Sequence, residues 1–465
     1  MNKKKLLAAF IATTVATPAV YAMSDKEVEA RFDKYEAQIK ALQAEVKDLK
    51  ANGGVVYIQD LQKQEKRNAA QIDSIKSKMD SDAERLKMNG FMTAAVSMGD
   101  DPIDAGYEID SNPNFRGDAK AGLQFNYSLG QNDSAVMQLV ARSRGGQPWQ
   151  TTAEWAYISH SLSESLQARM GRLRIPLYLE SETLDVGYSY PWVRPPVELY
   201  QTALTSYEGA DMLYKFSTGE VNHTLQPFVG SSTKHHDDPG QYGYVPLPAF
   251  VPGSASPNEN LQLDFKDLYG ITLNSTWGNF TTKATAMHLG LDAQVTALDN
   301  SFLVANALLA GMLQPPAFPN VGAGGVIAEN VDQLQYYAVG GMYDDGTWLA
   351  MLEESTIRTK HGALFGDNIS GQATLGYRID KWTPYGTYAW TQSQNVSDFA
   401  QPNRKMKSAS LGLRHELTNN LSAKMEWNHY YDFTNNGSYG SGSNSLAGSL
   451  GDNANVYTFA LDAVF

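Results

Sequence analysis

The sequence predicts an all-β membrane barrel of about 16 antiparallel transmembrane strands, preceded by an N-terminal α-helical segment. Three observations support this fold class: a long succession of short segments in which apolar and polar residues alternate, connections that alternate between tight turns and long loops, and a last alternating segment that ends on Phe465. Alternation with a period of two places side chains on opposite faces of a strand, so one face can meet lipid while the other stays polar.

Residues 1–22 have the pattern of a secretory signal peptide. Three lysines at positions 3–5 precede a short apolar run at 6–16, and the compact residues Val20 and Ala22 suit cleavage after Ala22. The run is shorter than the roughly 20 apolar residues that a membrane anchor needs. Cleavage removes three lysines and no acid, so the net charge falls from −13 to −16. This acidity argues against a nucleic acid partner.

The segment 23–85 is predicted to be helical. Its first part has apolar residues at heptad spacing with charged residues between them, and a Gly-Gly pair at 53–54 interrupts it. Such a seam favours a self-associating coiled coil over the alternative, an amphipathic helix lying on the barrel. The seam residues are Val28, Phe32, Tyr35, Ile39, Leu42, Val46 and Leu49.

From Leu86 onward the pattern changes to alternating segments that predict strands. These are residues 86–98, 119–129, 134–144, 151–162, 165–175, 209–217, 221–230, 266–276, 280–290, 333–343, 347–359, 369–379, 383–394, 407–417, 421–432 and 454–465. The tight turns between them fall at 131–133, 217–219, 278–279, 344–346, 380–382 and 418–420. Tight turns on one side and long loops on the other are typical of bacterial outer-membrane barrels, and an even strand count puts both ends of the barrel on the periplasmic side.

With this strand succession, the aromatic terminal strand and a long third loop after the fifth strand, residues 86–465 resemble a Gram-negative porin. The helical segment resembles the periplasmic coiled coil of DcaP-like dicarboxylate porins and of some siderophore porins. The resemblance implies an outer-membrane barrel in contact with lipid and lipopolysaccharide, a homotrimer, a periplasmic N-terminal segment, and passage of small hydrophilic solutes. It also implies that the third loop, 176–208, bends into the lumen and narrows it.

Five arginines are candidates for the basic wall of this constriction. They are Arg142, Arg144, Arg169, Arg172 and Arg174. Arginine presents a fixed fork of donors to carboxylates or phosphates. Arg172 and Arg174 share the parity of apolar Met170, so they need a bulge, for which Gly171 is the candidate, to face the lumen. Without the bulge they lie at the membrane rim beside lipid phosphates.

The loop supplies the acidic side, with Glu180, Glu182 and Asp185 as candidates. Acids on the loop facing arginines on the wall create a transverse field that orients hydrophilic solutes. The alternative is that these acids pair with basic neighbours and are structural. Arg194, between Trp192 and Pro195, is expected to pack the loop through a cation–π contact.

Catalytic and metal-dependent functions are not expected. The chain has no cysteine, and no spacing singles out a nucleophile with its base, so the sequence predicts no enzyme, no cofactor and no metal site. The segment His235–Asp238 has adjacent side chains that point in opposite directions on an extended chain, which favours a solvated loop. Two alternatives to a general diffusion channel stay open: a channel selective for dicarboxylates or siderophores, motivated by the arginines, and a barrel-anchored adhesin with a plugged lumen.

Overall fold

The computed structural model describes residues 66–73, 85–100, 111–144, 147–200, 204–235, 259–297, 326–360, 367–394, 405–432 and 453–465, with six further positions between 37 and 47. The chain divides into two units at Leu86. In the first unit, residues 66–73 and the six scattered positions are helical. The predicted signal peptide and the heptad seam lie outside the described residues. No helix in the described part is long and apolar enough to cross a membrane.

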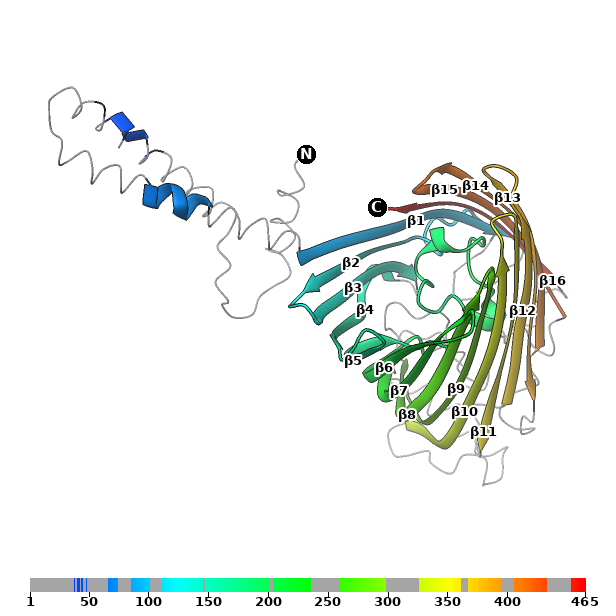
Figure 1. Cartoon of the computed structure of the whole chain (residues 1–465). Helices are drawn as coiled ribbons and strands as arrows, with labels where there is room; N and C mark the ends of the chain where they lie inside the picture. The colour runs from blue at the N-terminus through cyan, green and yellow to red at the C-terminus, as the bar shows by residue number, and fades with distance from the viewer. Residues whose placement is uncertain are drawn as a thin grey trace. The chain divides into compact units, whose positions relative to one another are not determined.

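The described part of the second unit forms a closed barrel of sixteen antiparallel strands, which confirms the predicted strand number and barrel architecture (Figure 1). Each strand pairs with its neighbours in sequence, and β1 pairs with β16. The strands are β1 (Leu86–Gly99), β2 (Lys120–Ser128), β3 (Asp133–Arg144), β4 (Gln147–Ser161), β5 (Leu166–Arg174), β6 (Ser206–Thr218), β7 (Val221–His235), β8 (Glu259–Trp277), β9 (Phe280–Ala297), β10 (Val326–Asp344), β11 (Trp348–Lys360), β12 (Asp367–Tyr377), β13 (Trp382–Gln394), β14 (Lys405–Thr418), β15 (Leu421–Tyr431) and β16 (Asn453–Val464).

The barrel closes at Gly90 and Phe465. Their backbones exchange two hydrogen bonds, of 2.7 and 2.9 Å. A Cβ on Gly90 would lie 2.2 Å from the Phe465 ring, so glycine leaves the space that the aromatic ring fills. Closure pairs the first strand with the last, and no open sheet edge is left at this seam.

The outer face of the barrel is apolar, with aromatic rings concentrated near the tight turns. On β16, Tyr457, Phe459 and Leu461 are exposed, whereas Thr458 and Asp462 on the opposite parity are buried. Near the turns, Trp277 stacks on Phe280 and further ring pairs follow around the barrel, including Trp348–Tyr377 and Trp382–His415. An apolar belt edged by aromatic rings suits a barrel that spans a bilayer.

Several strands are longer than predicted. β8, β9 and β10 reach 18 or 19 residues. Parts of the connection 291–332, between the predicted strands 280–290 and 333–343, belong to β9 and β10, and residues 298–325 lie outside the described part. The extensions carry Asn, Asp and Gln among their apolar residues, so they have the composition of loops. Backbone pairing between β8 and β9 nevertheless continues from Lys266 to Glu259.

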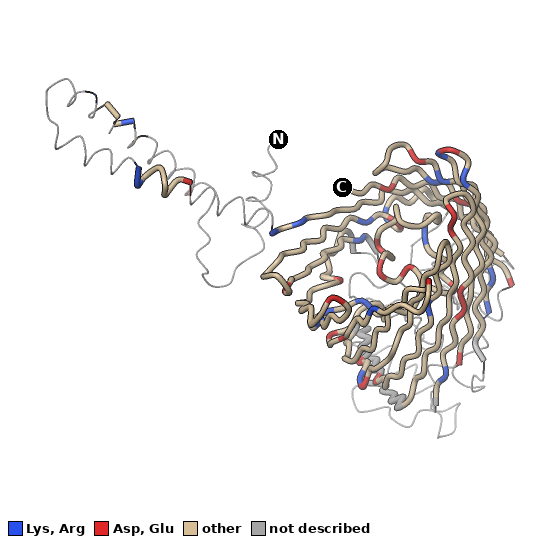
Figure 2. Tube along the Cα trace, in the orientation of Figure 1, with Lys and Arg blue, Asp and Glu red and all other residues tan. Residues whose placement is uncertain are grey.

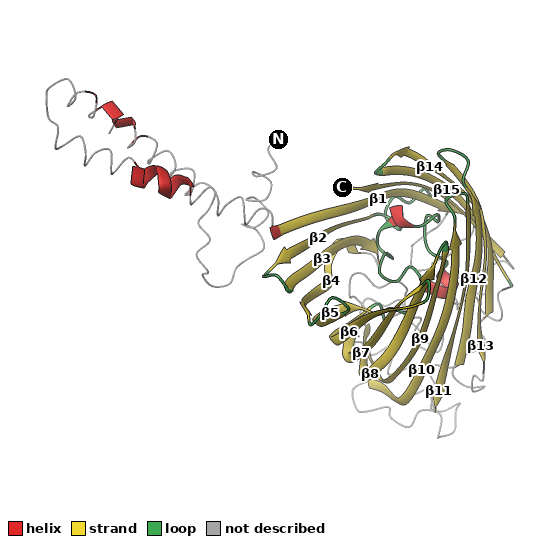
Figure 3. Cartoon of the chain, viewed as in Figure 1, coloured by secondary structure: helices red, strands yellow, loops and turns green. Residues whose placement is uncertain are grey.

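A hydrophobic cluster lies inside the barrel, where the segment after β5 packs against the wall. It joins loop residues Leu177, Tyr178 and Leu184 to wall residues that include Phe228 and Leu289. A second cluster joins Tyr190 and Trp192 of the loop to Leu349, Met351 and Tyr385. The loop therefore has its own dry contacts with the inner wall, and Figure 3 shows it within the ring of strands.

Candidate functional site

The candidate site is the loop between β5 and β6, residues 175–205, of which 201–203 lie outside the described part. It contains a 3₁₀ turn, η1 (Gly187–Ser189), and one helical turn, α4 (Val197–Tyr200). Prolines 195 and 196 precede α4, where a fixed φ and a missing N–H are tolerated. Figure 2 shows acidic positions along this loop inside the barrel. Side chains on β1–β3 and β8–β16 contact it, as described below.

At its base, the loop is held by a buried cluster of four charges. The Asp185 carboxylate forms ion pairs with both Arg142 and Arg174. Arg142 also donates to Glu154 at 2.7 Å. Glu154 is the extra residue of a bulge, since Gln138 pairs with Trp155 and Leu139 with Ala153. All four side chains are at most 3% exposed, so two positive charges are matched by two negative ones away from water.

The loop segments next to β5 and β6, residues 176–179 and Tyr200, are attached to β8, β9, β10 and β11. The Glu353 carboxylate accepts hydrogen bonds from the Leu179 backbone N–H at 2.8 Å and from the Tyr200 hydroxyl at 2.6 Å. Tyr336 donates to the hydroxyl of Tyr178. The carbonyl of Pro176 accepts hydrogen bonds from Thr272 and Thr285. Buried polar groups are costly without partners, so these bonds fix the path of the loop backbone.

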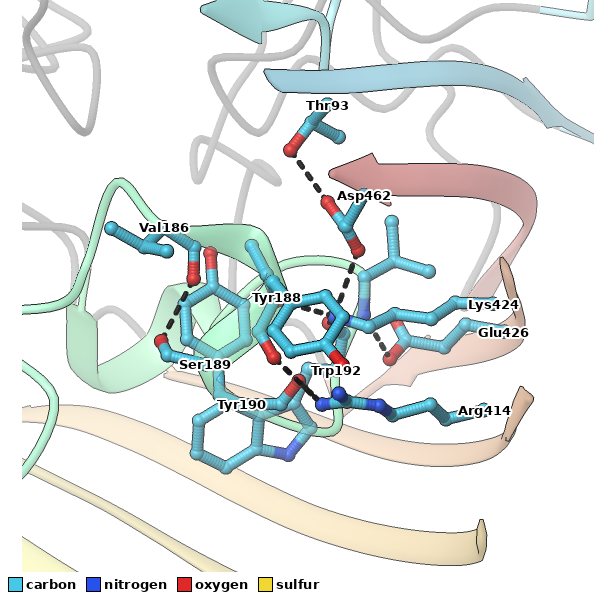
Figure 4. Close-up of polar contacts among 12 residues, drawn as sticks. Thr93, Val186, Tyr188, Ser189, Tyr190, Trp192, Arg414, Lys424, Glu426 and Asp462 are labelled. Carbon is cyan, nitrogen blue, oxygen red and sulfur yellow. Dashed lines mark hydrogen bonds and ion pairs between the residues drawn. The ribbon is translucent and has the colours of Figure 1, made fainter. Parts of the chain in front are cut away.

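The far end of the loop is attached to β14, β15 and β16 (Figure 4). Lys424 donates to the carbonyls of Gly187 at 2.6 Å and Trp192 at 2.7 Å, and forms an ion pair with Asp462 at 3.0 Å. Asp462 also accepts a hydrogen bond of 2.6 Å from Thr93. A Cβ at Gly187 would lie 2.1 Å from an Asp462 oxygen, so only glycine permits this approach.

Arg414 adds a second cation at the same place. It donates to the Tyr188 carbonyl at 2.8 Å, and its guanidinium lies 4.7 Å from the centre of the Tyr188 ring. The η1 turn thus offers backbone carbonyl oxygens to two wall cations, Lys424 and Arg414, rather than carboxylates. Carbonyls at the end of a short helical turn carry partial negative charge and accept such donors.

The remaining contacts at this end come from the residues that follow η1. Arg194 forms an ion pair with Asp118 at 2.6 Å and donates to Ser97 and Thr458. It packs the loop as predicted, and this ion pair and these hydrogen bonds hold it against β1 and β16. The Val193 N–H donates to Glu426.

Two of the predicted wall arginines, Arg172 and Arg174, were expected to need a bulge at Gly171 to face the lumen. No bulge occurs at Gly171, which pairs with Tyr157 and Gly209 in unbroken registers. Arg172 therefore keeps the parity of outward-facing Met170 and pairs with Glu208, so the prediction that it faces the lumen is wrong. Arg174 reaches the inner side without a bulge because it is the last residue of β5, where the chain turns inward.

The other predicted residues are placed as follows. Arg169 faces inward, forms hydrogen bonds of 2.7 and 2.5 Å with Asp211, and lies over the Tyr157 ring. Arg144 ends β3, and its side chain lies outside the described part. Glu182 pairs with Lys283 at 2.8 Å and stays half exposed. Glu180 accepts a hydrogen bond from Thr183.

The expected separation of loop acids from wall arginines is wrong for Asp185. Its carboxylate touches Arg142 and Arg174 instead of facing them across a gap, which is the structural alternative considered for the sequence. The sequence pattern does not single out Glu154, Lys283 and Glu353. The bulge at Glu154 shifts the alternation of β4, so the sequence does not show which way this side chain points. Glu353 is followed by Glu354, and alternation alone does not show which of the two glutamates faces inward. Among the described residues, no group of three His, Asp or Glu side chains could hold a metal ion.

Glu198 gives the site a dependence on pH. It lies in α4 against β12 and β13, and burial raises the pKa of its carboxyl from 4.5 to about 7. In the unfolded chain the Glu198 carboxyl ionises near pH 4.5, whereas in the folded chain it stays protonated up to about pH 7. The wild type therefore loses stability relative to Glu198→Gln as the pH rises from 4.5 to 7. The difference in free energy of unfolding should change by on the order of 3 kcal/mol. Urea unfolding of both proteins at several pH values measures this difference. A difference that does not change with pH would contradict the raised pKa of Glu198.

Comparison with known proteins supports the fold. No protein-family model matches the sequence, and no curated protein matches it significantly. A loop-deletion mutant of OmpT, an outer membrane protein of Vibrio cholerae, is 12% identical over 82% of this chain and 99% of its own, with a TM-score of 0.50. The outer membrane channel DcaP of Acinetobacter baumannii is 11% identical over 82% of this chain and 97% of its own, with a TM-score of 0.49. At 12% identity the likeness to the OmpT mutant concerns the fold alone.

Proposed function

We propose that this protein is an outer-membrane porin, through which small hydrophilic solutes diffuse passively along a water-filled barrel narrowed by the loop 175–205. The observation that carries the proposal is the attachment of this loop to the inner wall at three places: at Asp185, at residues 176–179 with Tyr200, and at residues 187–194. The loop lies inside a closed barrel with an apolar outer face. A loop held in this way permanently reduces the open cross-section of the lumen. The apolar belt on the outer face keeps the barrel in lipid.

The proposal gives the charged residues two different roles. Arg142, Arg174 and Asp185 hold the base of the loop and lie away from water. Arg169, Glu182 and Glu180 border the passage, since their side chains are more exposed than those of the base. Because most of these cations have a carboxylate partner, the transverse field is weaker than an unpaired arginine wall would produce.

The proposal includes the parts of the chain that precede the barrel. Residues 1–22 direct export, and residues 23–85 form a periplasmic helical coiled coil. The even number of strands places both ends of the barrel on the tight-turn side, which is the periplasmic side in outer-membrane barrels. A homotrimer would give the heptad seam its partners. Lipid and lipopolysaccharide would contact the outer face, and the channel needs no cofactor or catalytic group.

Planar bilayers test this function. The purified protein should give stable conductance steps, arriving in groups of three if the unit is a trimer. In asymmetric salt the reversal potential should be small, because Arg142, Arg169 and Arg174 each have an acidic partner. If the folded protein gives no conductance, the porin function is excluded and the barrel-anchored adhesin is favoured. Strong anion selectivity would contradict the charge pairing and favour a channel for dicarboxylates.

A further inference from the structure

A cavity of about 190 Å³ lies in the inner wall next to the loop. Its lining comes from β4 to β9, with Glu182 of the loop at its rim. Most lining residues belong to the halves of these strands nearest the tight turns, so the cavity lies on that side of the loop. It is smaller than the roughly 300–1,000 Å³ of sites for drug-sized ligands and holds several water volumes of ~30 Å³ each.

The charged groups of this cavity already have partners. Arg169 is bonded to Asp211 through two nitrogens, and Lys283 pairs with Glu182. The third cation, Arg174, pairs with Asp185. A charged solute would have to displace one of these carboxylates, which makes the resting cavity better suited to an uncharged ligand.

Two neutral polar atoms in the lining are buried and have no hydrogen-bond partner among the described residues: the indole Nε1 of Trp155 and the amide Oδ1 of Asn274. One is a donor and the other an acceptor. The Tyr157 ring lies 6.2 Å from the Trp155 ring, so aromatic surface lies beside the donor. Gln226, Thr224 and Thr272 add amide and hydroxyl groups.

We propose that this cavity is a binding subsite for a neutral polyhydroxylated solute, with room for one sugar ring. A hydroxyl group both donates and accepts, so sugar hydroxyls can satisfy the unpartnered Trp155 N–H and Asn274 oxygen. The C–H faces of a sugar ring can then pack on the aromatic rings of Trp155 and Tyr157. The inference rests on the proposed channel function, since solutes reach the cavity only through the lumen.

The test measures ion current through the channel while glucose is added. Glucose should reduce the current in a saturable way in the wild type. Trp155→Phe keeps the aromatic ring but removes the N–H, and should weaken the apparent binding constant about 2- to 10-fold, the effect of one hydrogen bond. Asn274→Leu removes the acceptor at similar size and should act in the same direction.

Controls separate this subsite from the channel itself. Trp348→Phe makes the same change at an exposed outward tryptophan and should leave glucose binding unchanged. A short polyethylene glycol of matched size controls for viscosity and exclusion. Without any conductance, the channel proposal fails; with normal conductance and no saturable glucose effect, only the subsite is wrong. Equal weakening by Trp155→Phe and Trp348→Phe, or stronger saturable block by acetate than by glucose, would also overturn the subsite.

Discussion

Replacing Asp185 with asparagine is expected to destabilise the protein by about 3–5 kcal/mol and to loosen the base of the loop. The change leaves Glu154 as the carboxylate shared by the guanidinium groups of Arg142 and Arg174, and removing one member of a buried ion pair typically costs this much. Urea unfolding of the wild type and of Asp185→Asn in detergent measures the difference in free energy of unfolding. Single-channel recordings should show a larger and noisier conductance.

A matched control distinguishes the cluster from the loss of any acid. Asp133→Asn removes the same charge from a contact with the His160 ring, in which both side chains are about half exposed. Exposed pairs contribute about 0–1 kcal/mol, so this variant should keep near wild-type stability and a quiet channel. If Asp185→Asn behaves like Asp133→Asn, the cluster does not hold the loop.

The second large effect is expected at the far end of the loop. Lys424→Met leaves the Gly187 and Trp192 carbonyls without this donor and Asp462 without its cation (Figure 4). Lys424 is buried among these groups, so we expect a loss of about 3–5 kcal/mol in the free energy of unfolding. The η1 turn should detach, and the conductance should fluctuate between two or more levels.

Lys215→Met is the control for this change. Lys215 lies exposed on the inner side of β6, and surface substitutions of this kind usually change stability by less than about 0.5 kcal/mol. A steady conductance in Lys424→Met, together with wild-type stability, would show that the hydrogen bonds to the η1 turn are dispensable.

The strands could be predicted because every strand of a barrel wall separates the same two environments. Lipid outside and polar groups inside impose alternation on every strand, and Leu411, Met425 and Tyr457 obey it. The rule applies only within the bilayer, so it does not predict the polar extensions of β8 to β10 as strands. It also fails at irregular positions: the bulge at Glu154 changes parity without a sequence signal, whereas Gly171 has a positive φ of 136° without forming a bulge.

The candidate site was only partly predictable for a related reason. Composition marks the loop, through its aromatic residues and acids, and parity separates Arg169 from the outward-facing Met170. Which acid meets which cation depends on contacts between residues far apart in the chain, such as Asp185 with Arg142 or Leu179 with Glu353. A single sequence does not give the distances between such residues. It therefore does not show that Asp185 contacts Arg142 and Arg174 instead of facing them across the lumen.

The attachment of the loop along its length restricts how such a channel can change during evolution. A foreign loop placed between β5 and β6 would lack the groups that now bond to Glu353, Lys424 and Asp118, so buried polar atoms of the wall would lose hydrogen-bond partners. New permeation properties must therefore arise at loop positions that make few wall contacts, such as Ser189, or by coupled replacement of a loop residue and its wall partner. Inheritance of the loop is tied to inheritance of the wall.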